Sequence, residues 1–366
     1  MTNNTNNFIE TYAQIMFANL EDIEELTLAL ETAIDAFLAD PTEANLEAAR
    51  DAWIEARPFY QESEIGRFYD GPIDDEDGPE GAINAWPLDE NYIDYVDGDA
   101  DSGLINDTDF EISEENLRNA NEAGGEANIA IGWHAIEFLL WGQDSDPEGP
   151  GARPATDYDE TSGDATNQDR RRAYLELVVD LLIADLRSVL AEWEPDSEDN
   201  YRAELESLSP AEALGRIMTG MGSLAFGELR GERLITPFTV KEQEEEHSCF
   251  SDLTHLDHLH DVIGIQSVWL GSYTRSDGST VEGTGVRDAA NGSQSLVTNI
   301  TAVLARAIAS LRSEELNPFD QAILGDDEEP GRVILQSVID DLSEFNDDFS
   351  SLAEELGVDI VTTLQD

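Results

Sequence analysis

The chain opens on a long segment whose apolar residues recur every three to four positions, FIETYAQIMFANLEDIEELTLALETAIDAFLAD at residues 8–40. This spacing places the apolar side chains on one face of a helix, and that face must be buried against other elements. The helix is predicted to stop at Asp40-Pro41, because proline cannot continue a helix. The same periodicity predicts further helices at 42–70, 113–141, 168–193, 209–233, 240–271, 293–313 and 330–356.

Segments rich in glycine, proline and aspartate separate these helices, which is typical of long irregular loops. They cover residues 70–112 and 143–167, and a loop rich in glycine and serine covers 272–292. No strand pattern is convincing, although a short hairpin is considered for Trp86–Val96. About four helices precede a boundary near 195–208 and about four follow it. The sequence therefore predicts an all-α fold of two related helical bundles packed together, one at 8–197 and one at 205–357, with long acidic loops.

The charge of the chain is extreme, with 81 acidic residues against 19 basic ones and a net charge of −62. Lys241 is the only lysine. Such a surface repels DNA, RNA and anionic lipid headgroups, so no nucleic acid is expected as a partner. At molar salt the screening length falls to about 3 Å, which relieves the self-repulsion. The composition favours adaptation to high salt over the alternative of an acidic protein that collects divalent cations loosely.

Compartment and membrane attachment are weakly constrained by the sequence. Cys249 is the only cysteine, so the chain forms no internal disulfide, which suits a reducing compartment or an exported protein that needs none. No window approaches the ~18 apolar residues of a membrane span. The start MTNNTNNF lacks the basic and apolar regions of a signal peptide. A chain trimmed of its export signal would look the same.

The stretch GWHAIEFLLWGQD places His134 three residues before Glu137 in an otherwise apolar helix. Residues three apart share a helix face, so the two side chains project together. A buried glutamate is costly unless it is paired or bound to a metal, and imidazole with carboxylate suits zinc, iron or manganese. The alternative is a buried His–Glu hydrogen bond that joins two helices. For an isolated pair, that structural role is the favoured one.

The other four histidines fall within fourteen residues and are interleaved with acidic residues. They are His247, His255, His258 and His260. This concentration indicates metal binding, and His247 and His255 are the stronger candidates because their surroundings are less charged. The alternative for His258 and His260 is an exposed acidic helix with incidental histidines.

A further polar patch, ARPFYQESEIGRF, places Tyr60, Glu64 and Arg67 at helical spacing after Arg57. It predicts inward-facing polar groups, or alternatively a surface ladder of ion pairs that contributes little stability. The sequence contains no HExxH zinc-protease motif, no Gly-rich phosphate loop and no GxSxG nucleophile motif.

Together these segments resemble the imelysin family, which includes the iron-regulated protein A proteins. GWHAIEFLLWGQD resembles the family's GxHxxE signature, and EEHSCFSDLTH followed by Asp257 is similar to its second-half signature. ARPFYQESEIGRF, PID and INAWPLD resemble its first-half landmarks, and the likeness runs from about residue 10 to 355. It implies two helical bundles with a polar site near their interface, in an exported cell-envelope protein linked to iron supply. The family is classed with the metallopeptidases, although many members have no demonstrated proteolysis.

The resemblance also implies site residues, carried over motif by motif. The GxHxxE signature falls on Gly132, His134 and Glu137, where Gly132 is a structural position. The second-half signature falls on His247, Ser251, Asp252, His255 and Asp257. Leu253 stands where the family pattern has a polar residue, usually asparagine, so the polarity of this segment departs from the pattern.

We therefore expect one site in a cleft between the bundles, holding a divalent or ferric metal ion such as iron or zinc. Its expected metal ligands are His134, Glu137, Asp252 and His255. Arg67 would balance the carboxylates, and His247, Ser251 and Asp257 would contact the ligand. The favoured function is binding of iron or an iron-containing ligand at the periplasmic or cell-surface side, with a membrane tether as one means of attachment. The alternative is a metal-dependent peptidase acting on a peptide, with Glu137 or Glu64 as catalytic base.

Overall fold

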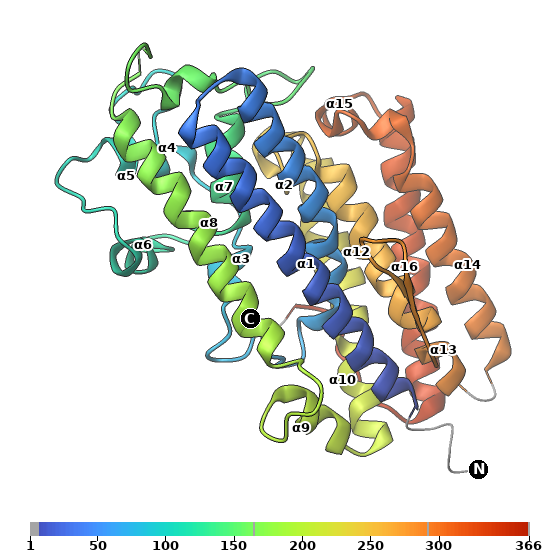
Figure 1. Cartoon of the computed structure of the whole chain (residues 1–366). Helices are drawn as coiled ribbons and strands as arrows, with labels where there is room; N and C mark the ends of the chain where they lie inside the picture. The colour runs from blue at the N-terminus through green and yellow to red at the C-terminus, as the bar shows by residue number, and fades with distance from the viewer. Residues whose placement is uncertain (1–6, 164, 291–292, 365–366) are drawn as a thin grey trace.

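A computed structural model describes residues 7–163, 165–290 and 293–364, and it confirms the all-α fold (Figure 1). The exception within these ranges is a two-stranded antiparallel sheet, in which β1 (Ser272–Thr274) pairs with β2 (Thr280–Glu282). Among the helices of the described ranges, none combines the length and apolar character needed to cross a membrane.

The first half of the chain is built on α1 (Asn7–Ala39), α2 (Glu43–Ser63), α7 (Trp133–Trp141) and α8 (Gln168–Ala191). The helices α1, α2 and α8 lie side by side in Figure 1, and α1 contacts both of the others. The side chain of Thr42 caps α2 by accepting a hydrogen bond from the backbone N–H of Asn45. The remaining elements of this half are short: η1 (Glu64–Gly66), α3 (Glu80–Ile83), α4 (Glu90–Ile93), α5 (Gly103–Asn106), α6 (Glu114–Ala120) and η2 (Ala155–Tyr158).

The second half is built on α10 (Pro210–Gly222), α12 (Thr254–Leu270), α14 (Gln294–Leu311) and α16 (Pro330–Leu356). A capping box between Ser209 and Glu212 is present at the start of α10. A π-helix, η3 (Ser223–Ile235), continues α10 and carries Arg233 inward. The remaining elements are α9 (Tyr201–Ser207), α11 (Thr236–Val240), η4 (Gln243–Glu245), α13 (Val286–Ala289), η5 (Glu314–Leu316) and α15 (Phe319–Leu324).

Three local expectations are wrong. The helix predicted to run up to residue 271 from 240 begins only at Thr254, because η4 and a segment of turns at 246–252 precede α12. The helix predicted at 113–141 is divided into α6 and α7, because Gly132 takes a positive φ of +94° and the side chain of Asn121 accepts hydrogen bonds from the extended backbone at Ala130 and Ile131. The hairpin considered for residues 86–96 is replaced by α4 and an isolated bridge between Val96 and Asp99. The strands lie instead in the predicted loop at 272–292.

The two halves share one hydrophobic core. Helix α2 packs against α1 and also against α12 of the second half, and Trp53 of α2 meets Trp133 and Trp141 of α7 edge to face. The polar residues of the candidate site lie where α2, α7 and α12 approach one another. The division of the chain near 195–208 stays a prediction.

Candidate functional site

The GxHxxE segment forms the start of α7, where the backbone leaves no room for a side chain at Gly132. Its φ of +94° is a conformation that L-residues disfavour, and a Cβ there would lie 2.6 Å from the carbonyl oxygen of Ile83. The turn therefore presses the start of α7 against α3, and all nine residues of the helix are buried.

His134 and Glu137 contact each other inside the protein, with His134 Nδ1 3.0 Å from Glu137 Oε2. The other ring nitrogen, Nε2, lies 3.2 Å from Nη2 of Arg57. Because a guanidinium can only donate, Nε2 accepts from Arg57, and Nδ1 carries the proton that His134 donates to Glu137. Burial, together with the charge of Arg57, holds the pKa of His134 well below its usual range, so the ring is neutral.

Glu137 links α7 to the second half of the chain. Its Oε1 accepts hydrogen bonds from the backbone N–H of Ser251 (3.0 Å) and from the Ser251 hydroxyl (2.7 Å). Burial raises the pKa of Glu137 to about 8, although the Ser251 donors and Arg57 act to lower it. Both carboxylate oxygens therefore already have protein donors.

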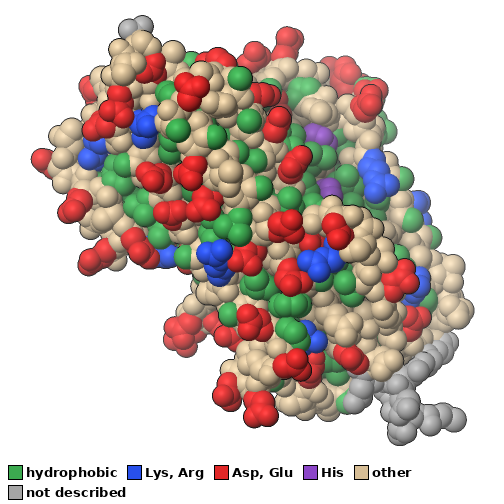
Figure 2. Space-filling model, in the orientation of Figure 1, with side chains coloured by type: hydrophobic (Ala, Val, Ile, Leu, Met, Phe, Trp, Pro, Cys, Tyr) green, Lys and Arg blue, Asp and Glu red, His purple; other side chains and the backbone are tan. Residues whose placement is uncertain are grey.

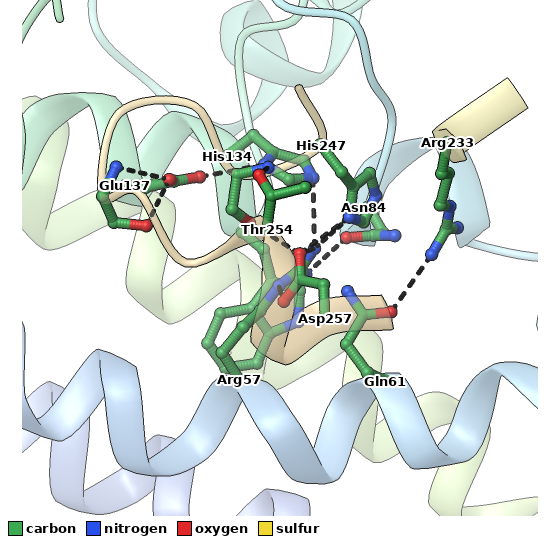
Figure 3. Close-up of polar contacts among 12 residues, drawn as sticks. Arg57, Gln61, Asn84, His134, Glu137, Arg233, His247, Thr254 and Asp257 are labelled. Carbon is green, nitrogen blue, oxygen red and sulfur yellow. Dashed lines mark hydrogen bonds and ion pairs between the residues drawn. The ribbon is translucent and has the colours of Figure 1, made fainter. Parts of the chain in front are cut away.

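Arg57 is the central cation of this network and is only 1% exposed. Its Nε and Nη2 lie 3.3 and 3.2 Å from the two carboxylate oxygens of Asp257, and Nη1 donates to Asn84 Oδ1 at 2.5 Å. The guanidinium also lies 5.4–5.8 Å from the ring centroids of three aromatic residues, Trp53, Tyr60 and Trp133. Figure 3 shows Arg57 between His134 and Asp257.

Asp257 accepts hydrogen bonds from two other residues besides Arg57. His247 Nδ1 lies 2.7 Å from Asp257 Oδ2, and the Ser248 hydroxyl donates to the same oxygen at 2.7 Å. Burial acts to raise the pKa of Asp257, but Arg57 and His247 outweigh it and hold that pKa well below its usual range. Asp257 is therefore a buried carboxylate that the protein itself neutralises.

Glu64 belongs to a neighbouring ion-pair cluster. Its Oε1 accepts from Asn84 Nδ2 (2.7 Å), and its Oε2 lies 2.6 Å from Nη2 of Arg233. Arg67 lies 3.5 Å from Glu64 and 3.1 Å from Glu80. Arg67 therefore pairs with Glu64 and Glu80 and not with the carboxylate of the GxHxxE segment.

Asp252 lies in a different cluster, with Asp144 and Asp320. All three are buried, and one carboxylate oxygen from each lies within 4.8 Å of the others. Gln243 Nε2 donates to Asp144 (2.8 Å) and to Asp320 (3.1 Å), while neither oxygen of Asp252 has a partner among the described residues. We call Asp144, Asp252 and Asp320 the aspartate triad.

The triad is short of positive charge. Burial and the neighbouring aspartates raise the pKa of Asp252 to about 8, and burial raises that of Asp144 to about 6. Glu246 is fully buried beside Asp320 and Asp252, and neither of its oxygens has a partner among the described residues. No arginine, lysine or histidine within the described ranges forms an ion pair with these four acids. Uncompensated buried carboxylates are costly, and a bound cation would remove that cost.

A family model for imelysin matches residues 17–348. The chain belongs to the imelysin family. A relative, iron-regulated protein A from Synechococcus elongatus, is 24% identical over 283 residues, a match that spans 75% of this chain and 66% of that protein.

Crystal structures of two further proteins share the fold of this imelysin. One, from Parabacteroides distasonis, is described as an iron-regulated protein A precursor and superposes with a TM-score of 0.72, 16% identity, and coverage of 96% of this chain and 94% of its own. The other is an imelysin-like protein from Psychrobacter arcticum, with a TM-score of 0.67, 15% identity and coverage of 97% of each chain.

The expected ligand set of this imelysin is divided between two places. His134 and Glu137 contact Arg57 and Ser251, whereas Asp252 belongs to the aspartate triad. His255 is 8% exposed, and its Nδ1 has no partner among the described residues. His258 is fully buried with both ring nitrogens unpartnered in the same ranges, while His260 lies 2.7 Å from Glu62.

Sequence reasoning missed Asp144, Asp320 and the role of Arg57 in this imelysin. Asp144 is the last residue of the quoted GxHxxE stretch, so its place next to the motif was an available signal. Arg57 belongs to the polar segment ARPFYQESEIGRF, but no feature of the sequence indicates that it contacts His134 and Asp257. Asp320 lies in the first turn of α15, and no motif in the sequence distinguishes it from the many other aspartates of this acidic chain.

Proposed function

We propose that this protein binds a hard metal cation, with iron as its physiological ion, through the aspartate triad. The observation that carries the proposal is the triad itself, three buried carboxylates within 4.8 Å of one another and without a compensating cation in the described ranges. Oxygen ligands of this kind suit Mg²⁺, Ca²⁺ and Mn²⁺, and ferric iron shares the preference for anionic oxygen. Glu246, and His255 through Nδ1, are the nearest candidates for additional ligands.

The choice of iron rests on the relatives. One is named iron-regulated protein A, and a protein of the same fold from another organism is described as an iron-regulated protein A precursor. The cell-envelope location that the family implies, periplasmic or cell-surface with or without a membrane tether, belongs to the same proposal. The resident ion would neutralise the triad and join Asp144 of the first half to Asp252 and Asp320 of the second.

The geometry favours binding over peptide hydrolysis. A peptidase needs a carboxylate that is free to take a proton from water. Glu137 and Glu64 each accept hydrogen bonds through both oxygens, from Ser251 and His134 in one case and from Asn84 and Arg233 in the other.

The test is the binding of Fe²⁺, Mn²⁺ and Ca²⁺ to the full chain in concentrated KCl, by calorimetry and elemental analysis. Screening at high salt suppresses loose binding to the acidic surface. We expect about one tightly held ion per chain, weakened by more than ~10-fold in Asp252→Asn. The matched control Asp347→Asn, at an exposed position of α16, should bind as the wild type does. Equal affinity in Asp252→Asn, or no stoichiometric ion in the wild type, would contradict the proposal.

A further inference from the structure

The segment that carries Asp252 is fastened to the first half of the chain. Ser251 donates to Glu137 from both its backbone N–H and its hydroxyl. One residue earlier, the carbonyl oxygen of Phe250 accepts from the backbone N–H of Gly151 (2.9 Å), and the Phe250 ring packs 5.2 Å from that of Phe138. The position of the segment is therefore set largely by residues outside its own half.

Asp252 itself has a backbone conformation that its neighbours must enforce. Its φ is +58°, in the left-handed region, which aspartate enters more readily than most residues other than glycine but still at an energetic cost. Such a conformation persists only where the surrounding contacts determine it. The paired hydrogen bonds from Ser251 to Glu137 immediately precede it and are the polar contacts best placed to do so.

Glu137 is in turn held in place by a chain of buried contacts. His134 orients its second oxygen, Arg57 orients His134, and Asp257 orients Arg57. Asp257 lies on α12, directly after the segment, and the Thr254 hydroxyl near the start of α12 accepts from the backbone N–H of Ser248 (2.9 Å). Figure 3 shows this sequence of contacts from Glu137 through His134 to Asp257.

We infer that the GxHxxE segment acts as a positioning device for the metal ligand Asp252, with Glu137 as the positioning residue and His134 and Arg57 as its supports. The inference rests on the proposed function of the aspartate triad. Residues that hold ligands in place are known to change metal affinity without touching the ion. Both oxygens of Glu137 already accept hydrogen bonds from the protein, so the positioning role requires no rearrangement of this side chain.

The experiment compares Glu137→Ala, Glu137→Gln and the wild type in concentrated KCl by two measurements. The first is Mn²⁺ affinity by electron paramagnetic resonance, and the second is hydrogen–deuterium exchange of the peptide spanning 248–253 without metal. Asp22→Ala is the control, because Asp22 is also a buried carboxylate that accepts from a backbone N–H and from side-chain donors (Ser276, Tyr273 and Arg275) but lies in α1.

We expect Glu137→Ala to weaken Mn²⁺ binding by ~10- to 100-fold and to speed exchange at 248–253, as for lost supporting contacts in other metal sites. Glu137→Gln keeps an acceptor oxygen facing Ser251 but turns its amide NH2 toward the Nδ1–H of His134, so its affinity and protection should lie between those of the wild type and Glu137→Ala. Asp22→Ala should alter neither measurement, even if it lowers the melting temperature.

The outcomes separate this inference from the proposed function. If the wild type does not bind Mn²⁺, the cation site itself is wrong. If the wild type binds Mn²⁺ and Glu137→Ala binds equally well with unchanged exchange, the triad stands and the positioning role is wrong. If Asp22→Ala weakens binding as much as Glu137→Ala does, the effect is general loss of stability, and the positioning role is again wrong.

Discussion

Arg57 donates a hydrogen bond to His134, with 3.2 Å between Nη2 and Nε2. The ring nitrogen that a metal would need is thereby occupied by a permanent cation. A metal ion could reach His134 only by displacing a guanidinium that also pairs with Asp257 and lies near three aromatic rings. The sequence of the GxHxxE segment is typical of a metal ligand, whereas the hydrogen bond from Arg57 gives His134 a structural contact.

Removal of Arg57 should be strongly destabilising. Arg57→Ala leaves Asp257 as a buried charge that keeps only its contacts with His247 and Ser248, so we expect the free energy of unfolding to fall by ~3–5 kcal/mol. Denaturant unfolding in concentrated KCl measures this. The control is Arg306→Ala, because Arg306 pairs with Asp341 and Glu344 at the surface and should cost less than ~1 kcal/mol. Similar costs for the two variants would contradict the structural role given to Arg57.

Gly132 should not tolerate a side chain. A Cβ there would be 2.6 Å from the carbonyl of Ile83 and would also require an unfavourable φ of +94°. Gly278 provides the matched control, because its φ is +82° but nothing lies within 4 Å of the added Cβ. We expect Gly278→Ala to cost ~1–2 kcal/mol from the backbone alone. Gly132→Ala should cost at least ~1–3 kcal/mol more from overpacking, as measured by thermal or denaturant unfolding.

Stability should depend on pH through Glu137. Burial raises its pKa in the folded protein from 4.5 to about 8, so between these values the folded state binds a proton that the unfolded state has released. The stabilisation is complete below the unfolded pKa and is lost as the pH rises through the folded value.

Glu137→Gln removes this titration. Relative to the wild type, the unfolding free energy of Glu137→Gln should therefore rise by more than ~1 kcal/mol between about pH 5 and pH 8.5. Asp347→Asn, at an exposed position, should follow the wild-type curve. Parallel curves for Glu137→Gln and the wild type would show that Glu137 is already ionised at low pH.

Salt should stabilise the fold by screening. With 81 acidic and 19 basic residues, the compact state brings like charges together (Figure 2 shows acidic side chains spread over the visible face). We expect the melting temperature to rise steadily from about 0.1 M to about 1 M KCl, as the screening length falls from ~10 to ~3 Å. Sucrose at equal osmolality favours compact states without screening charge, so it should give a smaller rise. An equal rise would argue against self-repulsion as the cause.

Features of this fold that depend on neighbouring residues could be predicted from the sequence, and features that depend on distant contacts could not. Helical periodicity is local, so α1, α8 and α16 could be predicted from the sequence. The break between α6 and α7 depends on a side chain, Asn121, that accepts hydrogen bonds from backbone nine and ten residues away, and no periodicity reports such a contact.

The candidate site likewise has one part that a local pattern predicts and one part that depends on long-range packing. His134 and Glu137 could be paired from their spacing, and they do lie 3.0 Å apart. The aspartate triad could not be predicted, because Asp144, Asp252 and Asp320 come from three distant segments that only the packing of the two halves brings together. In a chain with so many acidic residues, composition gives no means of selecting those three.

The burial of arginine has a consequence for the outside of the molecule. Five of the few basic residues are at most 4% exposed and contact partners inside the protein. They are Arg57, Arg153, Arg171, Arg233 and Arg332. The exterior therefore has few basic residues among its many acidic ones, and it must carry a dense counterion atmosphere. Any protein that docks on this chain would have to shed those ions or replace them with its own lysines and arginines, so the strength of its encounters would follow the ionic composition of the surrounding medium.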